Sequence, residues 1–183
     1  MKYRFVIAAF CLLSVCSLAN EFYASKALNP VKFSKAAEHA DIPLVRNGEL
    51  NFVIVCDLAP EKKKMHREWK SVTLAAAALQ DAFVRTTGKK PQVLSPGSAE
   101  AKKAKYIIAL GRSSVTDELK LDPLGLPREA FLVRSFARGV VIAGHDGSYI
   151  DGSYNHMDWN RYRLNGTLNG TYDFIERVLG LRC

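Results

Sequence analysis

The stretch "AFLVRSFARGVVIAG", residues 130–144, contains two apolar, β-branched runs separated by a few residues that include Gly139. Because β-branched and aromatic residues favour strands and glycine favours the turn between them, we predict strands over residues 130–135 and 140–143. A connection of about four residues is too short for a parallel crossover. The two strands therefore form an antiparallel hairpin.

The chain before this hairpin alternates between strands and a helix. Continuous apolar runs predict buried strands over residues 52–56 and 106–110, and a short strand is predicted over residues 92–94. Apolar residues recurring at steps of three and four predict an amphipathic helix over residues 68–87 that ends before Gly88. Strand, helix, strand order favours parallel crossovers, so the hairpin makes the sheet mixed. We expect an α/β (α+β) fold, with a mixed four- to five-stranded sheet and helices packed on it.

A second helix is predicted over residues 167–179, after a long polar loop over residues 144–163. Thr167 is expected to cap this helix, and Gly166 and Gly170 are expected to let its first turn approach a neighbouring backbone closely. The predicted apolar face should pack on the sheet. It consists of Leu168, Tyr172, Ile175 and Leu179.

The N-terminal residues 1–19 have the features of a secretory signal peptide. Two basic residues precede an apolar run over residues 5–15, and the small residue Ala19 provides a cleavage site. The run is shorter than the ~20 residues that a membrane-spanning helix needs. We therefore expect a secreted or periplasmic protein with no membrane partner after cleavage. It would comprise a lead-in segment over residues 20–47 and one domain over residues 48–183.

Charge and cysteine content exclude several kinds of partner and site. The net charge of +8 falls to +6 when the two basic residues of the signal peptide are removed (8 − 2), and the basic clusters at residues 61–67 and 102–105 lack interleaved aromatics. We therefore expect no nucleic-acid partner. Two of the four cysteines lie in the signal peptide, so Cys56 and Cys183 can form neither a disulfide framework nor a four-cysteine zinc site. Cys56 is predicted to be a buried structural thiol.

The polar loop carries candidate binding residues. Its acidic, histidine and asparagine side chains allow a calcium or zinc site, but their spacing matches neither helical zinc ligands nor a calcium loop, and plain turns use the same residues. We therefore expect no metal and no cofactor. The side chains concerned are His145, Asp146, Asp151, His156, Asp158 and Asn160. The aromatic Tyr154, Trp159 and Tyr162 are candidate glycan contacts through stacking; alternatively, Trp159 and Tyr162 pack beneath the loop and hold it in place.

The residue patterns predict no catalytic residue. The chain contains neither G-x-S-x-G nor H-E-x-x-H. Glycoside hydrolysis commonly needs two carboxylates on either side of one bond, whereas the acids of this sequence occur singly, in loops or on polar helix faces. "ALGRSS", residues 109–114, could hold an anion where a helix begins, but it lacks the spacing of nucleotide-binding glycines. We expect an ordinary strand-to-helix turn there.

Several stretches together resemble the N-terminal domain of bacterial alpha-glucuronidases, which is similar to the domain before the barrel in beta-hexosaminidases and in uncharacterised exported glycosidase-like proteins. These are "FVIV", "YIIALGRS", "EAFLVRS", "GVVIAGHD" and "DWNRYRLNGTLNGTYDFIERVLGLR", and the likeness covers residues 48–182. The most specific part is G-T-x-x-G-x-Y-x-F-x-E-x-x-x-G-x-R. It is carried by Gly166, Thr167, Gly170, Tyr172, Phe174, Glu176, Gly180 and Arg182.

The resemblance implies a fold similar to that of zinc proteases but without their metal centre. In that family a tryptophan, another aromatic residue and Pro-Gly follow the motif and lead into a catalytic (β/α)8 barrel, whereas Cys183 stands here in place of the tryptophan. The implied function is a non-catalytic accessory domain of a secreted carbohydrate-degrading glycoside hydrolase, truncated before its barrel, with the catalytic carboxylates in the barrel. The alternative is a free-standing exported module that binds a polysaccharide.

Overall fold

The computed structural model describes residue 32 and residues 38–57, 67–148 and 163–182. The chain divides into two compact units, Met1–Lys35 and Ala36–Cys183, and the fold is that of the second unit. The signal peptide predicted over residues 1–19 lies outside the described residues. So do the three candidate glycan contacts, Tyr154, Trp159 and Tyr162.

Within the described residues the main sheet has five strands, in the order β4-β3-β5-β7-β6. The strands are β3 (Phe52–Cys56), β4 (Val93–Leu94), β5 (Tyr106–Leu110), β6 (Phe131–Phe136) and β7 (Gly139–Gly144). Strands β4, β3, β5 and β7 are parallel to one another, and β6 is antiparallel to β7. The predicted α/β fold, its mixed sheet and its antiparallel hairpin are therefore confirmed.

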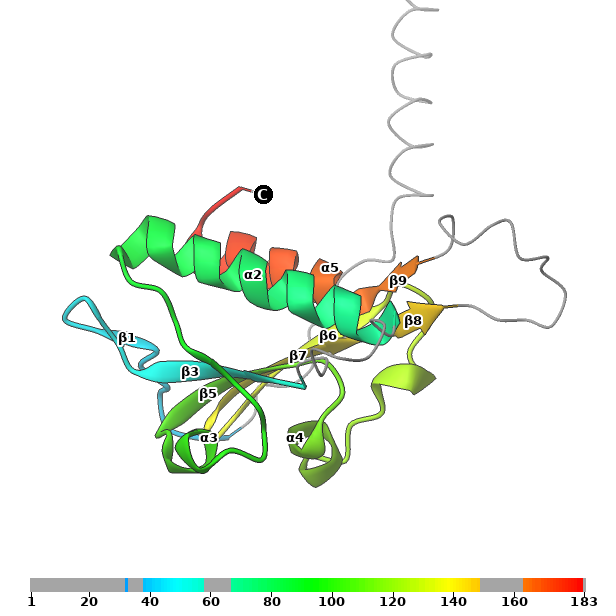
Figure 1. Cartoon of the computed structure of the whole chain (residues 1–183), viewed down its shortest axis with the longest axis horizontal. Helices are drawn as coiled ribbons and strands as arrows, with labels where there is room; N and C mark the ends of the chain where they lie inside the picture. The colour runs from blue at the N-terminus through cyan, green and yellow to red at the C-terminus, as the bar shows by residue number, and fades with distance from the viewer. Residues whose placement is uncertain (1–31, 33–37, 58–66, 149–162, 183) are drawn as a thin grey trace, which may run out of the picture. The chain divides into compact units, whose positions relative to one another are not determined.

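Helices cover both faces of this sheet (Figure 1). On one face lie α2 (Arg67–Thr87) and α5 (Gly166–Phe174), side by side. They pack on Phe52, Ile54 and Cys56, the alternate residues of β3 that share a side of the pleat. The other face carries the short helices α3 (Ala99–Lys103) and α4 (Ser114–Glu118), which pack on Val55 and its neighbours. Residues that alternate along each strand thus fill two separate cores.

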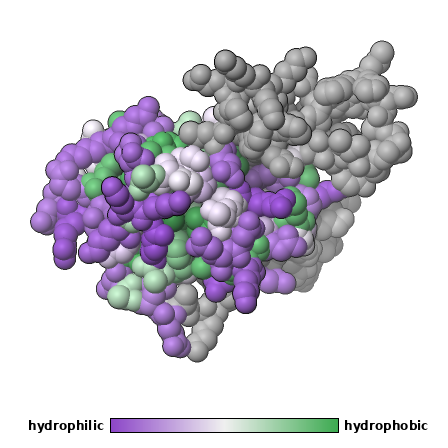
Figure 2. All heavy atoms as spheres, turned by 60° about the horizontal axis from the view of Figure 1, so that its bottom comes forward, coloured by the Kyte–Doolittle hydropathy of each residue, from purple (hydrophilic) through white to green (hydrophobic). Residues whose placement is uncertain are grey.

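The face under α3 and α4 is covered less completely. Each helix is five residues long, and Figure 2 shows apolar side chains among the polar ones on this side of the molecule. Val53, Leu132 and Phe136 are only partly buried there. A five-residue helix buries little more than one turn, so the main packing energy of the domain comes from the face under α2 and α5.

The described residues also contain two small two-stranded sheets, and neither was predicted. Strand β1 (Val45–Arg46) pairs with β2 (Glu49–Leu50) through a turn at Asn47 and Gly48, which both have positive φ angles. Strand β8 (Asp146–Ser148) pairs with β9 (Arg163–Asn165). The prediction of a loop over all of residues 144–163 was therefore wrong at both ends. Strands β8 and β9 are polar and pair with each other although they are separated in the sequence, so no local apolar pattern marks them.

Helix α5 departs from its prediction in two ways. It begins at Gly166 rather than after Thr167, so Thr167 lies inside the first turn and does not cap the helix. The buried residues of α5 include Thr171 and Phe174, whereas Tyr172, predicted on the apolar face, is 39% exposed. Small residues allow α5 to approach its neighbours closely. The buried face of α5 is therefore the one with small residues and not the most apolar one. A π-helical turn, Ile175–Leu179, continues the helix to Gly180.

Two further predictions are confirmed. Cys56 is fully buried, and burial together with the negative charge of Asp57 raises the pKa of its thiol to about 12. Helix α2 begins one residue earlier than predicted and ends at Thr87, before Gly88. No helix in the described part of the chain has both the length and the apolar character that crossing a membrane requires.

Candidate functional site

The carboxyl ends of three parallel strands meet at one edge of the sheet. Asp57 follows β3, Gly111 and Arg112 follow β5, and His145 follows β7. The next described helix after β3, α2, packs on one face of the sheet, and the next helix after β5, α4, packs on the other. A crevice lies between the ends of these neighbouring strands, where ligands bind in many open α/β sheets.

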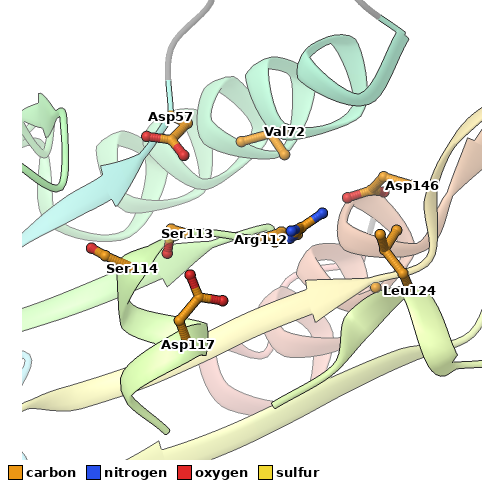
Figure 3. A pocket seen from close by; sticks show the side chains of 9 residues that line it. Asp57, Val72, Arg112, Ser113, Ser114, Asp117, Leu124 and Asp146 are labelled. Carbon is orange, nitrogen blue, oxygen red and sulfur yellow. The ribbon is translucent and has the colours of Figure 1, made fainter. Parts of the chain in front are cut away.

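This crevice has a volume of about 340 Å³. It is lined by Asp57, Val72, Arg112, Ser113, Ser114, Asp117, Leu124, Gly144 and Asp146. Figure 3 shows the Asp57 and Asp117 side chains pointing toward it from the end of β3 and from α4. Gly111, with a φ of 69°, turns the chain sharply after β5 and so places the next residues at the edge of the sheet.

Asp57 and Asp117 form a pair of interacting carboxyl groups. The surrounding protein partly excludes water from the Asp57 carboxyl and raises its pKa, and the negative charge of Asp117 raises that pKa further. Both residues nevertheless have substantial exposed surface, so solvent screens their interaction. The expectation that the acids of this chain occur singly was wrong, because the parallel pairing of β3 with β5 brings together carboxylates that are distant in sequence.

Arg112 and Ser113 add a cation and a hydroxyl to the crevice. Ser113 precedes α4, and its backbone N–H donates to the Thr116 hydroxyl at 2.9 Å. Ser113 and Thr116 are arranged as a capping box, in which the Thr116 N–H faces the Ser113 side chain without a hydrogen bond being assigned between them. The buried Ser113 Oγ therefore has no hydrogen-bond partner among the described residues. Residues 109–114 lead from the end of β5 into α4, as expected for a strand-to-helix turn.

Asp146 lines the same crevice, but its carboxylate is engaged in holding the fold together. Ser71 Oγ donates to it at 2.8 Å and the Thr167 N–H donates at 2.9 Å. The Thr167 hydroxyl also donates to Asp146 and accepts a hydrogen bond from the Gly144 N–H at 3.1 Å. This buried network connects α2, β7, β8 and α5. Asp146 is therefore an anchor of the sheet edge rather than an open binding group.

The predicted cluster of potential metal ligands is only partly described. Asp146 is occupied by the hydrogen bonds above, and His145 Nδ1 lies 2.6 Å from the Leu126 carbonyl oxygen. The other members, Asp151, His156, Asp158 and Asn160, lie outside the described residues. Across the described ranges no three His, Cys, Asp or Glu side chains are grouped so that they could hold a metal ion.

Sequence patterns missed Asp57, Arg112 and Asp117 as site residues. One signal could have found two of them: Asp57 and Arg112 closely follow the carboxyl ends of predicted buried strands, whereas Asp117 lies further on, in α4. Chemically, the carboxylates accept hydrogen bonds and the guanidinium donates them. The crevice can therefore hold a ligand that both donates and accepts.

Comparison with known proteins finds no match to a family model and no match to a curated protein.

Proposed function

We propose that this chain is a non-catalytic N-terminal accessory domain of a secreted or periplasmic glycoside hydrolase, in which a catalytic (β/α)8 barrel follows the domain. The enzyme would degrade a polysaccharide and resemble alpha-glucuronidases. The proposal rests on the sequence motif of residues 166–182, and the observation that best supports it is the set of close contacts around Gly166.

These contacts give the motif specific packing requirements. A Cβ atom at Gly166 would lie 2.4 Å from the His145 backbone nitrogen and 2.5 Å from the Ala130 carbonyl oxygen, which no side chain tolerates. At Gly170 it would lie 3.0 Å from the Phe131 ring. Thr167 supplies the hydroxyl that joins Asp146 to Gly144. A chance likeness would rarely reproduce residues at positions that packing constrains so strongly. The motif match therefore supports a shared fold.

One aromatic residue of the motif is not explained by packing within the domain. Tyr172 is 39% exposed on the outer side of α5, although the neighbouring Thr171 is fully buried. Exposed aromatic side chains are common where a domain contacts a partner. We assign Tyr172 to the contact with the barrel, which would explain why an aromatic residue stands at this position of the motif.

The proposal is tested by assay and by gene structure. The purified chain should hydrolyse aryl glucuronides, aryl hexosaminides and glucuronoxylan no faster than buffer does, because the catalytic carboxylates lie in the barrel. The DNA beyond the last codon should encode a barrel, either after a frameshift or in genomic sequence that continues past the end of the available contig.

Two results would contradict the proposal. Turnover that survives repurification and is lost in Asp57→Asn or Asp117→Asn would place an active site in this chain. A clean stop codon with no barrel-coding sequence downstream would instead favour the free-standing carbohydrate-binding module.

A further inference from the structure

The crevice at the carboxyl edge of the sheet contains polar groups that the fold does not use. Within the described residues, no hydrogen bond or ion pair engages the side chain of Asp57, Arg112 or Asp117. Ser113 is only 4% exposed, yet its hydroxyl also lacks a partner. Leaving a buried hydroxyl unpaired costs free energy, and folded proteins rarely do so without a reason. In Figure 3 this hydroxyl lies between the carboxyl groups of Asp57 and Asp117.

The charges in the crevice restrict what could bind there. An ionised carboxylate only accepts hydrogen bonds and a guanidinium only donates them. The carboxylates of Asp57 and Asp117, together with the hydrogen-bonded Asp146, repel an anionic ligand, while Arg112 disfavours a small cation. A neutral ligand with several hydroxyl groups satisfies both kinds of group, since each hydroxyl can donate to Asp57 or Asp117 and accept from Arg112.

Size and apolar surface restrict the ligand further. The volume of about 340 Å³ lies at the small end of the range for ligand pockets, about 300 to 1,000 Å³, and fits one small ring rather than an extended chain. Val72 and the 41% exposed Leu124 line the same space. They offer apolar surface to the C–H face of a ring whose hydroxyl edge meets the charged groups.

We propose that this crevice binds one neutral sugar ring. Asp57 and Asp117 accept hydrogen bonds from its hydroxyls, Arg112 donates to a hydroxyl or ring oxygen, and the Ser113 hydroxyl gains the partner that it lacks. The ligand class follows from the chemistry of the crevice, so this inference does not depend on whether a barrel follows the domain.

Nuclear magnetic resonance titration of the purified chain tests this assignment. The neutral probes are D-xylose, D-glucose, D-galactose and N-acetyl-D-glucosamine, with D-glucuronate as the anionic probe and D-glucosamine as the cationic one. At least one neutral sugar should shift the backbone amide signals of residues 111–117 saturably, with a dissociation constant of about 1 to 10 mM. D-Glucuronate should bind at least tenfold more weakly than D-glucose.

Variants separate the crevice from other surfaces. Asp117→Asn keeps the side-chain shape but removes the charge, and it should weaken binding of the neutral sugar about tenfold. Glu118→Gln, the neighbouring acid outside the crevice, should leave binding unchanged. The assignment is overturned by saturating shifts that map elsewhere, by binding that Asp117→Asn does not alter, or by the absence of saturation with every neutral sugar. Tighter binding of D-glucosamine or D-glucuronate than of the neutral sugars would also overturn it.

Discussion

Thr167 is the residue on which the buried network at the sheet edge depends. Its hydroxyl donates to the Asp146 carboxylate and accepts from the Gly144 N–H, and its backbone N–H also donates to Asp146. Thr167→Val keeps the volume but leaves two buried polar groups with one partner fewer. Hydrogen bonds to buried charged groups contribute about 1.5 to 3 kcal/mol each, so we expect the free energy of unfolding to fall by about 3 kcal/mol in urea denaturation.

A matched variant lies one turn further along the same helix. The Thr171 hydroxyl donates at 2.9 Å to the Thr167 carbonyl oxygen, which also belongs to the helical hydrogen-bond ladder. Thr171→Val should therefore cost about 1 kcal/mol or less. Equal losses from the two variants would mean that the Asp146 network contributes nothing particular to stability.

Unlike Thr167, Asp57 lowers the free energy of unfolding at neutral pH, and its effect depends on pH. Its folded-state pKa lies above the unfolded value near 3.8, because partial burial and the charge of Asp117 both disfavour the carboxylate. The folded state therefore binds the proton more tightly. Stability from this group is fully present below the unfolded pKa and is lost as the pH rises through the folded pKa. Asp57→Asn should stabilise the protein at pH 7 by up to about 0.5 kcal/mol, since solvent screens the charge, and should give no such gain near pH 3.

Thermal unfolding at the two pH values checks this prediction. Part of the effect comes from Asp117, so the gain from Asp57→Asn should be smaller in an Asp117→Asn background. An identical gain at both pH values would show that the substitution acts through packing or local geometry. Ligand-binding sites often contain charged groups that lower the stability of the folded protein, and Asp57 fits this pattern.

At the scale of elements, helix α5 crosses the end of β7 with two glycines in contact. A Cβ atom at Gly144 would lie 2.2 Å from the carbonyl carbon of Gly166, so each residue needs the other to be small. Gly166→Ala meets backbone atoms that cannot move aside, and we expect a loss of about 3 kcal/mol or more in urea denaturation. At Gly170 the added Cβ would lie 3.0 Å from the Cβ and the ring of Phe131, a milder overlap than the one with backbone at Gly166, so Gly170→Ala should cost less.

Gly97→Ala is the control for this series. No atom lies within 4 Å of the added Cβ, and the backbone there lacks the positive φ that an alanine would strain. Its effect should stay within about 0.5 kcal/mol. The close-packing account of α5 is wrong if Gly166→Ala is as well tolerated as Gly97→Ala.

For the whole molecule, Cys56 reports on cooperative unfolding. Its thiol is fully buried in the core beneath α2, and its pKa of about 12 leaves almost no thiolate at neutral pH. In a Cys183→Ser variant, a thiol reagent at pH 7.5 should therefore modify Cys56 only at the rate at which the domain opens. Added urea should accelerate the reaction together with the loss of the circular-dichroism signal. Modification at the rate of a free thiol in the native state would contradict the burial.

Local sequence predicted most of the elements, because buried positions in helices and strands show as apolar patterns in the sequence. The apolar runs gave β3 and β5 with their observed bounds, and the stripe of three- and four-residue steps gave α2 to within one residue. Close approach at Gly166 was also predictable, since glycine has no Cβ. The buried face of α5 was not, because its threonines and glycines pack tightly while Tyr172 remains partly exposed.

The sequence by itself determined the fold class, since alternating strands and helices followed by a tight hairpin allow few arrangements other than a mixed sheet. Only the tertiary structure decided that β3 and β5 are neighbours and that α2 and α4 lie on opposite faces of the sheet. That choice brings Asp57 to the same crevice as Arg112 and Asp117. Strand order depends on pairing between residues far apart in the chain, and no local pattern encodes it, so the elements were readable in sequence while the candidate site was not.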